Sequence, residues 1–298
     1  MSAFTQIDLS TLPAPDIIEE LNFETIFAAM LADLQARDPA FSALVESDPA
    51  YKILEVAAYR ETLVRQRVND SARAVMLAYA TGADLDQLGA LLGVSRFVID
   101  EGDPEAVPPV PEVLESDTEF RRRIQLSLEG FSVAGPRGAY IFHGLSADAN
   151  VLDISATSPS PGQVLISVLS RVGNGAASSP LIAAVNAKLN SDSIRPLTDQ
   201  VTVQSATIVN YAVTAGLYVY PGPDSSVVLT KALAALNTYI AQVHKIGQDV
   251  TLSGIYAALH QPGVQRVNLT SPSANVVISA TQASYCTAIN VTIAGTDE

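Results

Sequence analysis

Apolar and polar residues alternate through the middle of the chain, within residues 194–222. From Val209 to Val219 every second residue is apolar, which is the period of a strand that buries one face. A strand of about fifteen residues would reach about 50 Å, so we expect a bend near residues 215–216. Pro196 ends the helical pattern that precedes this region, because proline disfavours helical backbone in the residue before it.

Similar patterns lie on both sides of this central region. On each side a long amphipathic helix is followed by a short helix with a tyrosine (Tyr140, Tyr256), a valine-rich strand, a Ser-Pro-Ser turn and a second strand. An internal repeat of this kind predicts two copies of one helix–helix–strand–strand unit. The predicted segments are 117–131, 138–145, 151–156 and 164–168 in the first copy, and 225–245, 253–259, 264–269 and 276–278 in the second.

Unlike the central region, the N-terminal region has apolar residues at helical spacing and few strand signals. Residues 1–15 are predicted to form an extended arm, because Pro13 and Pro15 prevent an early helix. Apolar residues then recur at helical spacing across residues 17–34, and glycines bracket a short helix within residues 80–96.

Residues 49–79 contain neither glycine nor proline after the initial Asp48-Pro49 pair, which predicts a helix of up to about 45 Å. Its apolar stripe is too long for a small domain to cover alone. We therefore expect it to pack against other long helices, including those of other chains; one helix of an intramolecular bundle is the alternative. The residues assigned to this partner interface are Ile53, Val56, Leu63, Val64, Val68 and Val75.

An acidic segment separates the two patterns. Between Phe97 and Glu119 there are eight acidic residues, no basic residue and four prolines, which predicts an extended, semi-rigid spacer. The three arginines at 121–123 are expected to pair with this spacer or with a partner.

The predicted fold class is α+β multidomain, with N-terminal long helices and then two repeated helix–helix–strand–strand α/β modules. The predicted divisions are an N-terminal helical region (1–98), the acidic linker (99–116), a first α/β module (117–222) and a second α/β module (223–298).

Composition and charge narrow the function classes. The chain has 298 residues, of which 48% are hydrophobic and 16% charged, which is typical of an ordered protein with a hydrophobic core. A net charge of −14 disfavours broad electrostatic binding to nucleic acid or to anionic lipid. No apolar run approaches the roughly 20 residues of a membrane span. The single cysteine, Cys286, excludes an intramolecular disulfide, and we expect the chain to fold in a reducing cytosol.

The candidates for chemistry are sparse. Residues 171–175, between a predicted strand and helix, could form a phosphate-binding loop, but the lysine and glycine spacing of such loops are missing. His143, His244 and His260 are too widely spaced for a local metal motif, and Cys286 lies in a predicted strand. We therefore expect no catalytic, cofactor or metal site. A cytosolic α/β enzyme acting on an unknown small molecule remains the alternative hypothesis.

Four segments in a fixed order resemble the baseplate assembly protein J-like family of contractile-tailed phages and related contractile injection machines. The resemblance extends over most of residues 55–269. The segments are ATGADLDQLGALLGVSR at 80–96, the acidic stretch leading into ESDTEFRRRIQLSLEG at 115–130, IRPLTDQVTVQSATIVNYAVTAGLYV at 194–219, and HKIGQDV at 244–250 followed by QPGVQRVNL at 261–269.

This resemblance implies a structural role as a wedge protein in the virion tail baseplate, assembled in the host cytoplasm around the central spike hub of a sixfold baseplate. It implies that the N-terminal helices join those of a second copy and of another wedge protein in a shared bundle. The C-terminal modules are then expected to contact neighbouring wedges. Further implied partners are the sheath-initiator and hub or spike proteins. From the charge, the apolar runs and the motifs above, we expect no nucleic acid, membrane or cofactor.

Overall fold

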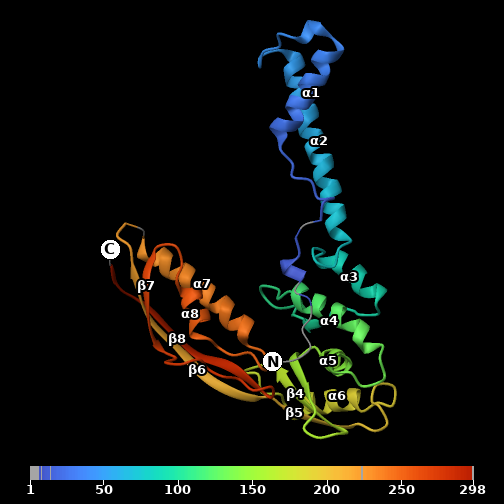
Figure 1. Cartoon of the computed structure of the whole chain (residues 1–298), viewed down its shortest axis with the longest axis vertical. Helices are drawn as coiled ribbons and strands as arrows, with labels where there is room; N and C mark the ends of the chain where they lie inside the picture. The colour runs from blue at the N-terminus through green and yellow to red at the C-terminus, as the bar shows by residue number, and fades with distance from the viewer. Residues whose placement is uncertain (1–6, 8, 14, 223, 297–298) are drawn as a thin grey trace. The chain divides into compact units, whose positions relative to one another are not determined.

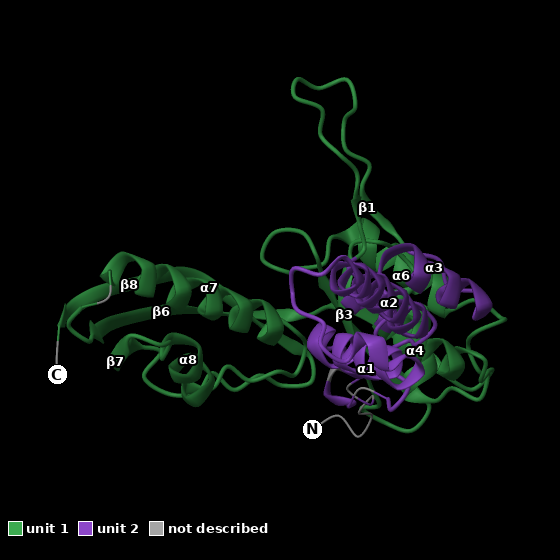
Figure 2. Ribbon diagram, turned by 90° about the horizontal axis from the view of Figure 1, so that it is seen from above, with its two compact units in different colours: residues 1–5, 97–115, 122–298 green, residues 6–96, 116–121 purple. Residues whose placement is uncertain are grey.

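The structure, a computed structural model, describes residues 7, 9–13, 15–222 and 224–296. The chain divides into two compact units, coloured separately in Figure 2. The helical unit runs to Arg96 and includes Ser116–Arg121, and the sheet unit contains Phe97–Glu115 and the residues from Arg122 onward. Of the predicted N-terminal arm, residues 1–6, 8 and 14 lie outside the described residues, and Leu9–Thr11 forms a short 3-10 helix.

The helical unit contains α1 (Phe23–Arg37), α2 (Pro49–Ala74) and α3 (Gly82–Leu91). Helix α1 begins later than the periodicity predicts, because Asn22 caps it by accepting a hydrogen bond from the amide of Thr25. Helix α2 starts at Pro49 as predicted. It ends five residues before the predicted Tyr79, because the amides of Val75 and Met76 both bond to the carbonyl of Arg73 instead of to carbonyls four residues back.

One side of α2 packs within the helical unit. The ring of Phe27 on α1 lies 4.7 Å from that of Tyr51 on α2, and Ala58 is completely buried. Further along the same side, the buried amide of Asn69 exchanges two hydrogen bonds with the main chain of Glu19, at 3.1 and 2.9 Å. A buried amide with both groups satisfied fixes the preceding segment against α2.

Arg96 holds the remaining parts of the helical unit together. Its guanidinium forms ion pairs with Asp86 on α3 at 2.7 Å and with Asp117 at 2.8 Å, and it stacks 4.6 Å from the ring centre of buried Phe120. Arg121 donates to two main-chain carbonyls at residues 77 and 80. These bonds explain why residues 116–121 belong to the helical unit, although α4 (Asp117–Gly130) continues into the sheet unit.

The acidic segment is a hairpin, so the prediction of an extended spacer at 99–116 is wrong. Strand β1 (Val98–Asp100) pairs antiparallel with β2 (Val113–Leu114), and Asp103 and Val110 exchange two main-chain hydrogen bonds of 2.9 Å. The base is closed where the amide of Glu115 donates to the carbonyl of Phe97 at 2.9 Å. The two ends of the segment therefore meet, while its tip extends away from the rest of the sheet unit (Figure 2).

The reversal has a local cause. The carboxylates of Asp100 and Asp103 accept hydrogen bonds from the amides two residues later, at 2.9 and 3.0 Å, and Gly102 adopts the left-handed backbone conformation with φ 67°. Asx turns and a left-handed glycine fold the chain back. A composition rich in proline and acids is equally typical of such turns and of an extended spacer.

The first sheet has the order β3-β4-β5, formed by β3 (Val151–Thr157), β4 (Gln163–Ser170) and β5 (Gln200–Ser205). Strands β3 and β4 are antiparallel, and β5 is parallel to β4 after crossing through α6 (Ser179–Leu189). Helix α5 (Arg137–Leu145) contributes buried side chains to the same core. Members of that core include Leu126, Tyr140, Ile154, Ile166, Val168, Val185 and Leu189.

The second sheet has the order β7-β6-β8, formed by β6 (Thr207–Val219), β7 (Val264–Ser271) and β8 (Gln282–Thr296). Helices α7 (Ser225–Val243) and α8 (Leu252–Leu259) lie along one face (Figure 1). The predicted alternation in β6 is confirmed, because Val213, Ala215, Leu217 and Val219 are buried in this core. The register with β7 shifts between Thr214 and Ala215, next to the bend that the sequence predicts near residues 215–216.

Two details of the predicted modules differ from the structure. Residues 276–278 form no strand; only one bridge joins Val250 and Val276, and the last strand is β8, which pairs with β6. Ala206 separates β5 from β6, so the central region contributes to both sheets, and a boundary at 222/223 separates β6 from its own sheet. The physical reason is that strand pairing is non-local, so alternation reveals a strand without identifying its neighbour.

Candidate interaction surface

The side of α2 that faces away from α1 is apolar and exposed. All six residues that the sequence assigned to a partner interface lie there with large exposed fractions. These fractions are 69% for Ile53, 62% for Val56, 43% for Leu63, 64% for Val64, 56% for Val68 and 71% for Val75, which is the C-cap residue. Large aliphatic side chains in such numbers on one helix are unusual for a surface that stays in water.

The six residues share one face by helical geometry. At about 100° per residue, they fall within an arc of about 140° whose centre is opposite Ala58 and Asn69, the buried residues of α2. We call this arc the α2 face. Tyr59, which is 55% exposed, borders the arc and was not predicted, although it lies three residues after Val56 and one helical turn before Leu63. Helix α2 therefore packs within the helical unit through the side of Ala58 and Asn69, and its opposite side is exposed.

The three arginines at 121–123 are committed within the chain. Arg121 binds main-chain carbonyls as described above, and Arg122 pairs with buried Asp153 on β3 at 2.7 Å. Arg123 pairs with Glu115 at the base of the hairpin, Nε to Oε1 at 2.7 Å. The expectation that an arginine pairs with the acidic segment is confirmed for Arg123.

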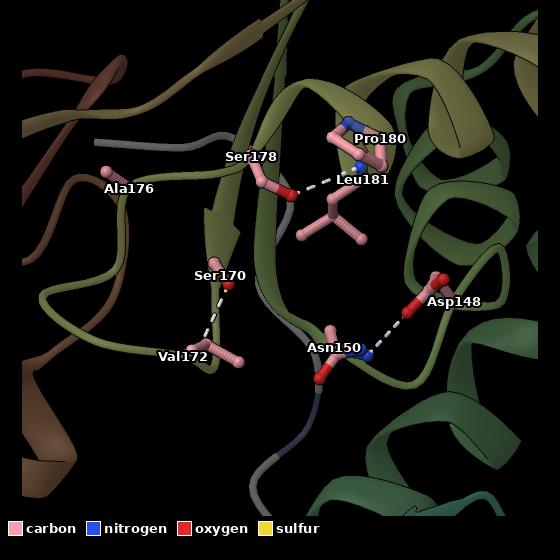
Figure 3. A pocket seen from close by; sticks show the side chains of 8 residues that line it. All are labelled: Asp148, Asn150, Ser170, Val172, Ala176, Ser178, Pro180 and Leu181. Carbon is pink, nitrogen blue, oxygen red and sulfur yellow. Dashed lines mark hydrogen bonds between the residues drawn. The ribbon is translucent and has the colours of Figure 1, made fainter.

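A cavity of about 300 Å³ lies beside the loop at 171–175 (Figure 3). Three of its polar side chains already accept hydrogen bonds in local turns and caps. Ser178 accepts a hydrogen bond from the amide of Leu181 at 3.4 Å, and Asp148 accepts one from the amide of Asn150 at 2.8 Å. Ser170 accepts one from the amide of residue 172. No lysine or arginine is among the residues that line it. The cavity therefore lacks the groups that a phosphate-binding loop needs. Its lining residues are Asp148, Asn150, Ser170, Val172, Ala176, Ser178, Pro180 and Leu181.

The histidines and the cysteine have structural surroundings. Nε2 of His143 lies 3.1 Å from the carbonyl of Gly130, and burial lowers the pKa of His143. His244 and His260 are the C-cap residues of α7 and α8. Burial raises the pKa of the Cys286 thiol, which opposes formation of the reactive thiolate. Within the described part of the chain, no three His, Cys, Asp or Glu side chains are grouped to hold a metal ion.

The helices of the described residues include none with the length and apolarity required to cross a membrane. The described residues thus combine an uncovered apolar helix face on α2 with candidate polar groups that are already engaged in the fold. This combination is typical of a subunit that other chains complete in an assembly.

Comparisons with known proteins identify the assembly. Residues 46–103 match the baseplate J-like N-terminal domain, residues 132–205 the baseplate J-like central domain, and residues 211–292 the baseplate J-like protein C-terminal domain. Baseplate protein J of Escherichia phage P2 is 52% identical over 299 residues, covering 98% of this chain and 99% of that protein. The solved 6-fold symmetrised cryo-EM structure of the anti-feeding prophage (AFP) baseplate matches with 14% identity and a TM-score of 0.42, over 61% of this chain and 44% of that chain.

The chain belongs to the baseplate J-like family. It is a structural component of the baseplate, and its place is the virion tail baseplate. The resemblance that the four sequence segments predict is confirmed.

Proposed function

We propose that this subunit is a wedge protein and that its α2 face packs against helices of other baseplate proteins. The partners proposed for the bundle are a second copy of the chain and another wedge protein, with sheath-initiator and hub or spike proteins as further neighbours in the baseplate. The observation that carries this proposal is the exposure of the six aliphatic residues of the α2 face, from Leu63 at 43% to Val75 at 71%.

The free energy available from covering this face is substantial. Full burial of an aliphatic side chain contributes about 1.5–3 kcal/mol. Because roughly half to two thirds of each side chain is exposed, covering it contributes about 1–2 kcal/mol. Six such residues give on the order of 6–12 kcal/mol, which offsets much of the cost of holding two chains together.

The proposed bundle is tested by replacing Leu63 with aspartate and measuring incorporation into tail particles. Leu63 is exposed, so the free subunit should keep its stability within about 0.5 kcal/mol. The carboxylate would be buried without a partner in a bundle, so incorporation should be lost. Leu91→Asp is the matched control, because Leu91 is an 81% exposed leucine of α3 in the same unit. Normal incorporation of Leu63→Asp would contradict the proposal.

The two α/β modules are proposed to mediate contacts between neighbouring wedges. Support comes from β8, a strand of 15 residues without a charged side chain. Among the described residues it pairs along its length with β6 alone, apart from one isolated bridge between Ile246 and Ala283. An uncharged edge strand of this length offers unpaired main-chain groups to another chain. The repeated order α4-α5-β3 and α7-α8-β7 supports the proposal that the modules arose as a repeat.

We also propose that the protein performs no catalysis, in contrast to the alternative of a cytosolic α/β enzyme. The supporting observation is that the candidate groups bind main-chain atoms or lie at helix caps. The triple variant His143→Ala, His260→Ala and Cys286→Ala should therefore assemble into infectious particles. Loss of infectivity by a variant that is still folded and incorporated would contradict this.

A further inference from the structure

Two arginines interrupt the α2 face at its centre. Arg60 and Arg67 are exposed, and at about 100° per residue both fall inside the arc of about 140° formed by the six aliphatic residues. They are seven residues apart, so their side chains leave the same side of the helix about 10.5 Å apart along its axis. The face therefore consists of an apolar stripe with two positive charges at heptad spacing.

These arginines differ from the other charged residues of the helix. The other basic side chains of α2 are neutralised within the helical unit, whereas Arg60 and Arg67 form no ion pair with any described residue. The pairs are Lys52–Glu55 at 3.0 Å, Arg65–Glu61 at 2.6 Å, Arg65–Glu19 at 3.1 Å and Arg73–Asp70 at 3.5 Å. Among the described residues, the helix thus leaves two charges without an acidic partner, both on the exposed α2 face.

Direct pairing of this face with the same face of a second copy would be unfavourable. In a parallel pair, Arg60 would oppose Arg60 and Arg67 would oppose Arg67. In an antiparallel pair centred on Leu63 and Val64, Arg60 would oppose Arg67 twice. Like charges brought together inside an apolar contact are destabilising in either orientation.

We infer that the α2 face binds a helix of a different baseplate protein, one that carries two carboxylates seven residues apart within an apolar stripe. This inference rests on the proposed bundle and specifies the chemistry of its partner. The guanidinium groups of Arg60 and Arg67 bind the two carboxylates through paired N–H···O hydrogen bonds, while their aliphatic stems lie against the neighbouring valines and leucine. The charges set the register, and the aliphatic residues supply the affinity. A second copy of the chain then joins the bundle through a different side.

The test uses the full-length protein and three synthetic helical peptides. Two peptides of about 28 residues share an apolar heptad stripe and differ only at two positions seven residues apart, which are glutamate in one and lysine in the other. The third peptide is residues 49–75 of this chain. At low salt the glutamate peptide should bind at least about tenfold more tightly than the lysine peptide, and the preference should shrink as salt is raised.

The variants decide the role of the arginines. In Arg60→Glu/Arg67→Glu the preference should reverse to the lysine peptide, whereas Arg60→Lys/Arg67→Lys, the matched control, should keep the preference for glutamate. Equal binding of the two designed peptides, or binding of the 49–75 peptide as tight as that of the glutamate peptide, would overturn the inference.

Particle assembly separates this inference from the proposed function. If Leu63→Asp blocks incorporation and Arg60→Glu/Arg67→Glu also blocks it, both stand. If the aspartate variant blocks incorporation and the arginine reversal assembles normally, the bundle stands and the inference about its partner fails. If the aspartate variant assembles normally, the proposed bundle fails first.

Discussion

Replacing Arg123 with methionine should destabilise the sheet unit by about 3–5 kcal/mol. The side chain of Arg123 is 5% exposed and that of Glu115 is 3% exposed, and Nε of Arg123 lies 2.7 Å from Oε1 of Glu115. The guanidinium also stacks 4.1 Å from the ring centre of Phe97. Methionine fills a similar volume, so the main effect of the change is to leave a carboxylate buried without its positive partner.

Two variants and one assay check this magnitude. Urea unfolding followed by circular dichroism on the full chain should show a large downward shift in the sheet-unit transition for Arg123→Met. The double variant Arg123→Met/Glu115→Gln should recover a large part of the loss, because no buried charge remains. A loss below about 1 kcal/mol for Arg123→Met, within the range of exposed pairs, would refute the reasoning.

The surroundings of His143 and of the hairpin give three further expected outcomes. Burial lowers the pKa of His143, so as pH falls below 6.5 the unfolded chain takes up a proton before the folded chain does, and the stability of the folded chain should fall. The variant His143→Gln should therefore show a smaller fall in urea midpoint between about pH 7.5 and about pH 5.5. A fragment of residues 97–298 should melt at a higher temperature than one of residues 117–298, which lacks Phe97 and Glu115; equal melting would contradict the role given to the hairpin base. Replacing residues 101–111 with a short glycine turn should leave the melting temperature of the sheet unit unchanged, since the hairpin is closed at its base, and a clear drop would show that the tip carries stability.

The sequence was most informative where structure depends on local periodicity. The long helix at α2 and its six aliphatic residues could be predicted because one helical face repeats every three to four residues. The buried face of β6 followed from alternation over eleven residues, Val209 to Val219. The sheet order could not be predicted in this way, because nothing near Ala206 indicates that the chain leaves one sheet and enters another.

The remaining errors also have physical causes. The hairpin at 98–114 depends on Asx turns at Asp100 and Asp103, which composition alone does not distinguish from an extended proline-rich segment. The role proposed for Arg60 and Arg67 could not be predicted from the stripe, because it depends on the pairing of the neighbouring basic residues of α2 with acids.

Cover of the α2 face by other baseplate proteins is tested most directly by cysteine labelling of Val64→Cys in a Cys286→Ser background. Labelling is measured in the free subunit and in purified tail particles, with particles unfolded in guanidinium as the reference for complete labelling. Val64 is 64% exposed in the free chain, so the new cysteine should react readily there. Protection of that cysteine in the particle is the predicted result. Labelling in the intact particle as rapid as in the free subunit would contradict the account.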